Sequence, residues 1–360
     1  MIRILFLLLI MYCNYSMEQD TCDDDNCEEE SNEKELFSKS AESHYIAGAM
    51  GNYEPEKGAF SQNDSPGENG KPVNLDVDQI SLLRYGMSEE VSNMIALNRS
   101  VPDIRHNGCR YWHYPIHLPN ASVVLVFHNE ALSVLLRTVY SIINRSPKHL
   151  LEEILLVDDY SDTSSYKDLG SELENKIKDL DKVRLIRNSE RQGLIRSKNI
   201  GANQSKGEVV VFLDAHCEVN INWLPPLLAP IAEDKRTVSV PLVDRIDYAT
   251  FEYQSVYQQE ERPVGIWEWG FLYKESRGSG AEAEGKTLEE VMSSCYPSPV
   301  HAGGLIAVNR DYFLGLGGYD DGLLVWGGEQ VKISKHIFKQ FALLIFSMNF
   351  HSKYGCVEEE

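Results

Sequence analysis

An acidic and a basic side chain, Asp214 and His216, follow a run of residues typical of a β-strand, Glu208–Leu213. Residues i and i+2 of an extended strand point to the same face, so a carboxylate and an imidazole emerge side by side. In an open α/β sheet, ligands bind beyond the carboxyl ends of the strands. There the pair can hold a divalent cation, and that cation can hold a diphosphate. The alternative is a polar strand end that caps the next turn, because a short motif alone is only a hypothesis.

Two further strand-like runs also end in polar residues. Asp158 and Asp159 follow Glu153–Val157, and such carboxylates can accept hydrogen bonds from a nucleobase or a ribose, or cap a helix. His128 follows Ser122–Phe127 and can stack on or hydrogen-bond a nucleotide. Its alternative is a loop histidine whose hydrogen bonds are satisfied within the protein.

Arginines and glycines supply candidate contacts to phosphate and sugar. Arg191 and Arg196 flank the start of a predicted helix, where a cation suits a phosphate or a sugar hydroxyl; the alternative is a surface salt bridge. Gly303-Gly304 permits a ligand to approach the backbone closely, or forms a simple turn.

Near residue 330, Trp326 and Glu329 place an aromatic face and a carboxylate around two glycines. Aromatic faces stack on sugars and carboxylates bind sugar hydroxyls. The alternative is an aromatic side chain in the core beside an exposed acid.

These residues are positioned by strands that alternate with helices. Helical spacing is found within 132–143, 166–178 and 193–204, and strand-like runs cover 122–127, 153–157, 182–187, 208–213 and 237–243. This alternation predicts an α/β fold with a mostly parallel sheet and right-handed crossovers, a Rossmann-like nucleotide domain at about 115–250. Neither a Gly-x-Gly-x-x-Gly fingerprint after the first strand nor a Gly-Lys-Ser/Thr loop is present, which disfavours dinucleotide oxidoreductases and P-loop NTPases.

The following segment, about 251–329, is less regular. It contains an aromatic-rich stretch, a predicted loop and a predicted strand entered through paired glycines: Gly265–Tyr273, Ser276–Glu284 and His301–Val308.

The chain is strongly acidic, with a formal net charge of −21 over 360 residues. This argues against a nucleic-acid partner, which requires a basic face, and means that local cations or a metal must hold any nucleotide. Ten acidic residues lie between Glu18 and Glu35, so residues 17–75 are predicted to form a disordered stem.

The N-terminus predicts entry into the secretory pathway. One arginine and a run of apolar residues, Ile4–Cys13, predict that residues 1–16 are a signal peptide or a short signal-anchor. Six Asn-x-Ser sequons agree with this destination, at Asn14, Asn63, Asn98, Asn120, Asn144 and Asn203.

Together these motifs resemble the polypeptide N-acetylgalactosaminyltransferases, the family that starts mucin-type O-glycosylation. The matching runs extend in the family's order over about residues 80–329: Val124–Glu130, Leu135–Thr138, Asn144–Pro147, Glu153–Asp159, Arg191–Arg196, Phe212–Glu218, Trp223–Leu228, Ala302–Leu305 and Trp326–Glu329. Gly265–Trp269 resembles a branch that prefers peptides already carrying a sugar.

The resemblance implies a GT-A catalytic domain over residues 76–329, in which the half at about 251–329 binds the acceptor. It also implies a UDP-GalNAc donor, Mn²⁺, a retaining transfer and a Ser/Thr hydroxyl of a peptide or glycopeptide as acceptor. It implies a Golgi enzyme with its catalytic domain in the lumen, anchored as a type II membrane protein through the N-terminal segment only, or secreted if that segment is cleaved. By the same match, Asp214 and His216 are metal ligands, and Glu329 and Arg196 are the catalytic residues. The implied substrate-binding residues are His128, Asp158, Asp159, Arg196, Gly303, Gly304, Trp326 and Glu329.

The match stops at Glu329, so residues 330–360 are expected to be a divergent tail without the family's lectin domain. The family pairs the cysteine that corresponds to Cys109 with one in the segment lacking here, and Cys356 could substitute. Three hypotheses follow: a transferase, a non-catalytic relative that binds UDP-sugar or peptide, and a secreted carbohydrate-binding protein.

Overall fold

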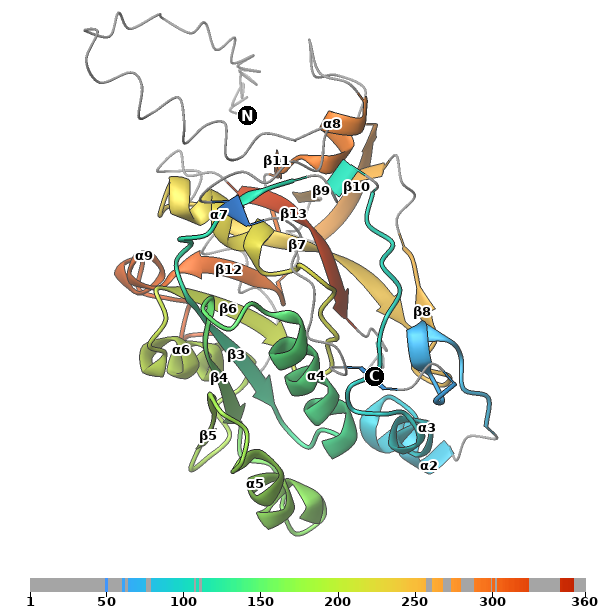
Figure 1. The fold of residues 1–360 in the computed structure, drawn as a ribbon. Helices are drawn as coiled ribbons and strands as arrows, with labels where there is room; N and C mark the ends of the chain where they lie inside the picture. Colours follow the sequence, from blue (N-terminus) through green and yellow to red (C-terminus); the bar gives the residue numbers. More distant parts are fainter. Residues whose placement is uncertain are drawn as a thin grey trace, which may run out of the picture.

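The centre of the molecule is one nine-stranded mixed sheet with helices on both faces (Figure 1). The computed structural model describes residues 49–50, 60–61, 64–75, 79–106, 108–109, 112–256, 261–267, 273–279, 288–298, 300–301, 303–323 and 344–352. The strand order is β11-β13-β7-β12-β6-β3-β4-β5, and β8 pairs with β7 beside this path.

Four adjacent parallel strands form the nucleotide-domain part of this sheet: β3 (Ala121–Phe127), β4 (Leu151–Asp158), β5 (Val183–Arg187) and β6 (Val209–Asp214). All seven residues of β3 are buried, as expected for a β-branched run covered on both faces. These four strands confirm the predicted ones within one or two residues at each end. The strand predicted over 237–243 extends three residues further, to Ile246.

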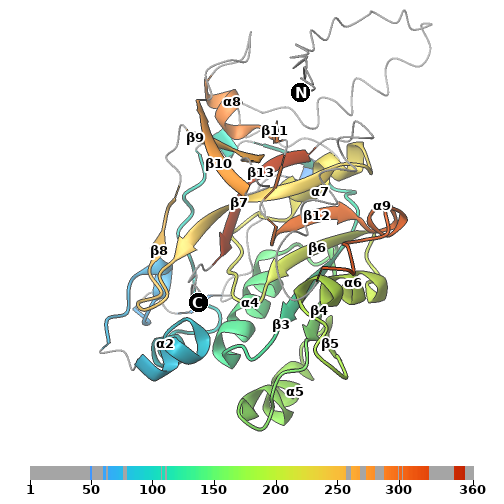
Figure 2. The same ribbon diagram turned by 180° about the vertical axis from the view of Figure 1, so that it is seen from behind.

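The side chains of β3 alternate between two separate cores. Val123 and Leu125 pack in the cluster that also holds residues of α4 (Leu132–Arg145), α5 (Ser171–Ile177) and α7 (Pro225–Glu233). Val124 and Val126 pack instead with residues of α6 (Leu194–Gln204) and α9 (Arg310–Gly315). Figures 1 and 2, seen from opposite sides, show these helices against the sheet.

Beyond β6 the sheet is mixed. β12 (Ile306–Asn309) runs antiparallel to β6 and to β7 (Val238–Ile246). The strand predicted over His301–Val308 is thus shorter, because Gly303 and Gly304 form a turn before it. The remaining strands of this part are β8 (Tyr253–Gln254), β11 (Tyr296–Pro297) and β13 (Leu344–Ser352).

A hairpin of β9 (Glu261–Trp267) and β10 (Tyr273–Ser279) extends from the sheet, followed by α8 (Leu288–Ser293). The prediction of a loop at Ser276–Glu284 is wrong for residues 276–279, which pair with β9. Their polar composition hides this, because the cross-strand backbone hydrogen bonds do not depend on side-chain type. Residues 280–284 lie outside the described residues.

The N-terminal part of the described chain packs on the sheet domain through α2 (Gln79–Tyr85) and α3 (Glu89–Met94). The prediction of a disordered stem is wrong for residues 64–75. Glu68 is only 3% exposed and its Oε1 accepts a hydrogen bond from Ser100 N at 3.0 Å, and Val73 packs in a core cluster with Val91 and Phe251.

Of the earlier stem residues, only 49–50 and 60–61 are described. Ala49–Met50 form β1, which pairs with β2 (Tyr114–Pro115). The predicted signal segment, residues 1–16, also lies outside it. Among the described helices, none is long and apolar enough to cross a membrane.

Candidate functional site at the carboxyl ends of the strands

Three of the predicted site residues, His128, Asp158 and Asp214, lie where the order of the parallel strands reverses. The chain builds β3, β4 and β5 in one direction and then returns to place β6 on the other side of β3. In the register of the sheet, Asp214 lies beside Val126, and Asp158 lies beside Phe127. Such a switch point is where ligands bind in open α/β sheets, so the sheet brings the predicted residues to one edge.

His216 is paired with a carboxylate at this edge. Its Nδ1 lies 2.9 Å from Oε2 of Glu130, and the two side chains are 29% and 11% exposed. When a carboxylate engages Nδ1 as a hydrogen-bond acceptor, Nε2 carries the lone pair that can bind a cation. The arrangement therefore suits a metal-binding histidine.

Asp214 lies against the paired glycines. A Cβ atom added to Gly304 would lie 3.0 Å from Oδ2 of Asp214. Lys198, a residue of α6 that is 1% exposed, donates to the carbonyl oxygens of Gly304 at 3.2 Å and Gly303 at 3.4 Å. The predicted sugar-binding turn and the predicted metal aspartate are thus in contact, and a buried cation holds the turn.

The same helix holds the loop that precedes residue 324. Asn199 donates to the carbonyl oxygen of Tyr319 at 3.0 Å, and Nε of Arg196 donates to that of Asp321 at 2.8 Å. Contact of Arg196 with a nucleotide stays a prediction. Trp326 and Glu329 lie outside the described residues, so their predicted roles also stay predictions.

Asp159 is buried and anchors the loop before α6. Its Oδ1 accepts hydrogen bonds from Gln192 N at 2.8 Å and from Asn188 Nδ2 at 3.0 Å. Its Oδ2 accepts from Gly193 N at 2.9 Å and pairs with Arg191 at 2.6 Å. Burial by itself would raise the pKa of Asp159, but these bonds and the Arg191 charge outweigh it and lower the pKa.

Asp158 is likewise engaged inside the protein, by Ser161 N at 2.8 Å and by the guanidinium of Arg187. Both aspartates therefore organise the loops at the strand ends, a role that the sequence analysis did not predict. Direct contact of either one with UDP stays a prediction.

His128 closes β3 at the same edge. Its Nδ1 lies 2.9 Å from the carbonyl oxygen of Asp159. Burial, followed by the nearby charge of Arg191, lowers the pKa of His128. A neutral imidazole at this position can stack on or hydrogen-bond a nucleotide without adding charge.

The donor atoms at this edge suit a divalent transition metal such as Mn²⁺. Asp214 offers a carboxylate oxygen and His216 an imidazole nitrogen, a mixed set that Mn²⁺ accepts. Within the described residues no cluster of three or more His, Cys, Asp or Glu side chains could hold a metal. Two protein ligands leave coordination positions for the oxygens of a diphosphate.

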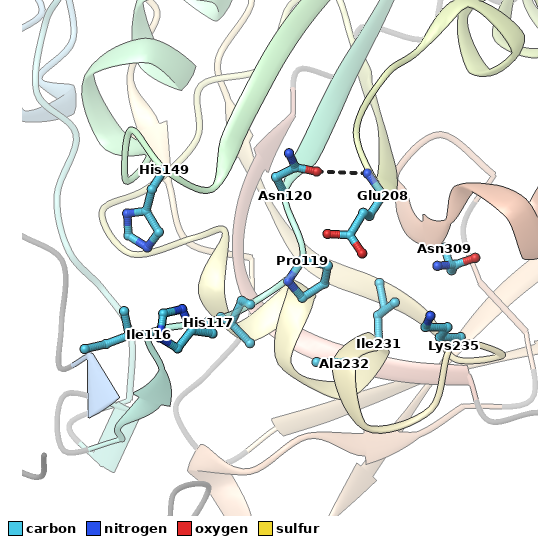
Figure 3. Close-up of a pocket in the computed structure, with 11 residues that line it drawn as sticks. Ile116, His117, Pro119, Asn120, His149, Glu208, Ile231, Ala232, Lys235 and Asn309 are labelled. Carbon is cyan, nitrogen blue, oxygen red and sulfur yellow. Dashed lines mark hydrogen bonds between the residues drawn. The ribbon is translucent and has the colours of Figure 1, made fainter. Parts of the chain in front are cut away.

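A separate cavity of about 520 Å³ lies at the opposite end of the same strands (Figure 3). Asn120 precedes β3 and Glu208 precedes β6, and Oδ1 of Asn120 accepts a hydrogen bond from Glu208 N at 3.0 Å. Lys235, His117 and His149 also line it. None of the predicted site residues contributes to this cavity.

The sequence analysis missed Glu130 and Lys198 as residues of the site. A signal for Glu130 existed, because it follows the same predicted strand as His128. No comparable signal marked Lys198, since a lysine in a helix is ordinarily exposed.

Comparisons with known proteins agree with this fold. The model of the family described as "Glycosyl transferase family 2" matches residues 122–313, which is more than half of the chain. The chain belongs to glycosyl transferase family 2. The matched range begins in β3 and ends in α9. It therefore includes the carboxyl ends of β3, β4 and β6, where the site lies.

Sequence relatives confirm the resemblance to N-acetylgalactosaminyltransferases. The chain is 48% identical over 299 residues to N-acetylgalactosaminyltransferase 7 of Drosophila melanogaster, which covers 82% of this chain and 49% of that protein. It is 41% identical over 311 residues to N-acetylgalactosaminyltransferase 7 of Homo sapiens, covering 83% and 46%. The chain thus spans about half the length of the relatives that it matches.

A solved structure shows the same fold. The crystal structure of GalNAc-T7 with UDP, GalNAc and Mn²⁺ superposes with a TM-score of 0.76 at 39% sequence identity, covering 84% of this chain and 57% of that one. The predicted GT-A fold is therefore confirmed.

Proposed function

We propose that this chain transfers N-acetylgalactosamine from UDP-GalNAc to Ser/Thr hydroxyls of polypeptides, with retention of configuration and with Mn²⁺. The observation that carries the proposal is the contact of Gly304 with Asp214, beside His216, at the switch point of a family 2 domain. Further support comes from the relatives, which are N-acetylgalactosaminyltransferases, and from a similar structure that holds UDP, GalNAc and Mn²⁺.

We assign metal, nucleotide and sugar binding to different residues of the site. Asp214 and His216 would hold Mn²⁺, which when bound offsets negative charge on the diphosphate of the leaving group. His128 and the loop anchored by Asp159 would bind the nucleotide. The Gly303-Gly304 turn lets the donor sugar approach the backbone, because no side chain intervenes. Arg196, Trp326 and Glu329 are proposed to complete the donor site.

The direct test is sugar transfer from UDP-GalNAc to a plain and to a GalNAc-bearing Ser/Thr peptide, each with Mn²⁺ and with a chelator. We expect transfer that the chelator abolishes. A folded chain that transfers nothing under any of these conditions would refute the proposed activity.

A second candidate function is Mn²⁺-dependent UDP-sugar binding without transfer. It is favoured by the presence of only two candidate metal ligands at the site among the described residues. Metal-dependent UDP binding together with absent transfer would identify this case. If UDP does not bind but free sugars do, the chain is instead a carbohydrate-binding protein.

The metal ligands can be tested separately from transfer. Asp214→Ala removes a carboxylate at a strand end, outside the two core clusters. We expect it to abolish Mn²⁺-dependent UDP binding in calorimetry while circular dichroism stays unchanged. Unchanged UDP binding, or loss of the fold, would contradict the metal-ligand assignment.

We further propose that the chain is delivered to the secretory pathway and acts in the Golgi lumen, anchored through its N-terminal segment or secreted. The apolar segment Ile4–Cys13 and the sequons support this. Asn203, at the end of α6, is the exposed sequon asparagine among the four in the described residues, whereas Asn120 is half-buried.

Expression in secretory cells tests this localisation. We expect a glycosidase-sensitive glycan that disappears in Asn203→Gln and persists in Asn120→Gln. An unglycosylated, cytosolic product would contradict the proposal.

A further inference from the structure

Glu130 occupies a rigid position between two elements of the site. It lies three residues after the end of β3 and two residues before the start of α4, whose first turn packs in the core. Its Oε1 accepts a hydrogen bond from Ala131 N at 3.1 Å, and its Oε2 lies 2.9 Å from His216 Nδ1. One oxygen is therefore held by the start of the helix while the other faces the imidazole.

The backbone around His216 is held by the same helix. Thr138 Oγ1, on α4, donates to the carbonyl oxygen of Ala215 at 2.8 Å, and Ser141 Oγ accepts from Val219 N at 3.2 Å. The guanidinium of Arg145, also on α4, donates to the carbonyl oxygen of Val219. Side chains of α4 thus hold the main chain on both sides of His216, and Glu130, just before α4, holds its ring. These contacts restrict rotation of the ring.

Glu130 contacts His216 through Nδ1, the nitrogen on the near side of the ring. A carboxylate at Nδ1 favours the tautomer that carries its proton there and keeps the lone pair on Nε2. Carboxylates in this relation to a ligating histidine orient the ring and increase the basicity of the binding nitrogen. Glu130 itself does not complete a three-ligand cluster with Asp214 and His216 in the described part of the chain.

We propose that Glu130 is a positioning residue that fixes the orientation and tautomer of His216, so that Nε2 faces the divalent cation. The inference rests on the proposed function, because it assigns the cation to Asp214 and His216. It adds a residue that acts through His216 and does not bind the cation itself.

The test compares Mn²⁺ binding in the presence of UDP for the full chain and three variants, by calorimetry or by electron paramagnetic resonance of free Mn²⁺. Glu130→Gln keeps the shape and removes the charge, and Glu130→Asp keeps the charge on a shorter stem. Glu208→Gln is the control, since Glu208 is an exposed carboxylate at the opposite end of the sheet. ¹⁵N spectra of labelled histidine without metal report the tautomer of His216 independently of activity.

For Glu130→Gln we expect about 10- to 100-fold weaker Mn²⁺ binding, and a His216 signal shifted away from the Nδ1–H tautomer. The Mn²⁺ affinity of Glu130→Asp should lie between those of Glu130→Gln and the unmodified chain. The affinity of Glu208→Gln should equal that of the unmodified chain. Unaltered affinity and an unaltered tautomer in Glu130→Gln would overturn the inference.

A loss in Glu130→Gln as complete as in Asp214→Ala would also overturn it, because Glu130 would then be a direct ligand. If the unmodified chain binds Mn²⁺ normally, these results bear on Glu130 alone. If the unmodified chain binds no Mn²⁺ with UDP, the proposed function fails together with the inference that depends on it.

Discussion

At the scale of single residues, the site depends on the absence of a side chain at position 304. The nearest atoms to an added Cβ are the carboxylate oxygens of Asp214, at 3.0 and 3.3 Å. Contacts this short require a neighbour to move by a few tenths of an ångström. Because Lys198 holds the carbonyl oxygens of the turn, the carboxylate is the group more easily displaced.

Gly304→Ala should therefore weaken Mn²⁺-dependent UDP binding by roughly tenfold, a typical effect of disturbing a metal ligand's support. Gly315→Ala is the matched control, since an added Cβ at this helical position meets nothing within 4 Å. There we expect unchanged binding and a gain in stability of about 0.5–1 kcal/mol. Calorimetry and urea unfolding measure the two effects; equal binding by both variants would rule out a critical contact at Gly304.

At the scale of elements, a buried ion pair joins the N-terminal segment to the loop after β6. Arg99 donates to Glu218 at 2.8 and 2.9 Å, and both side chains are nearly inaccessible. The guanidinium groups of Arg137 and Arg145, both on α4, lie in the same region and donate to backbone carbonyl oxygens. The segment before β3 thus braces the loop that carries His216, although it lies outside the matched family range.

Breaking this pair should be costly. Arg99→Met leaves the Glu218 carboxylate buried without its bidentate partner, and the expected loss is about 3–5 kcal/mol in the free energy of unfolding. Arg236→Met is the control, because Arg236 and Asp234 form an ion pair with side chains 57% and 40% exposed. Its expected loss is much smaller, because exposed ion pairs contribute little to stability. Urea denaturation compares them; similar losses would show that the buried pair is not a brace.

Glu218 also predicts a dependence of stability on pH. Burial would raise its pKa, but the charge and hydrogen bonds of Arg99 outweigh this and lower the pKa to about 2. A carboxyl whose folded pKa is depressed stabilises the native state above its unfolded pKa, and the stabilisation is lost as pH falls toward the folded value. Between the ordinary value of 4.5 and about 2, the unmodified chain should therefore lose stability faster than Glu218→Gln. Urea unfolding at several pH values checks this, and parallel curves would contradict it.

At the scale of the whole molecule, the C-terminal segment completes the sheet. β13 lies between β11 and β7 and runs parallel to β7, with Phe346 opposite Val240. The tail predicted to diverge thus supplies an internal strand, whose backbone groups pair on both sides around Ile345 and Phe346.

Phe346→Pro removes one backbone donor from this internal strand, where proline is not tolerated. The expected loss is about 1–3 kcal/mol, the cost of leaving a backbone group of the sheet unsatisfied. Phe346→Val keeps the backbone donor and a high strand propensity, and should lose less. The midpoints of thermal unfolding distinguish the two, and identical midpoints would show that this strand adds nothing to the sheet.

Most strands and helices of the nucleotide half could be predicted from the hydrophobic pattern. For example, β3 and β6 are covered on both faces and are therefore continuous apolar runs in the sequence. The hairpin at 273–279 could not, since polar side chains there conceal a strand that backbone pairing creates. The packing of residues 64–75 was also missed, because Ser100, a hydrogen-bond partner of the buried Glu68, lies 32 residues away.

The sequence by itself determined the alternation of strands and helices and the spacing that puts Asp214 and His216 on one face, since both are local properties of an extended or helical backbone. Only the tertiary structure decided which residues support them. Glu130 is 86 residues from His216, and Gly304 reaches Asp214 through the turn before an antiparallel strand. Such contacts exist because a crossover connection places β6 beside β3. Local sequence patterns do not specify which strands become neighbours.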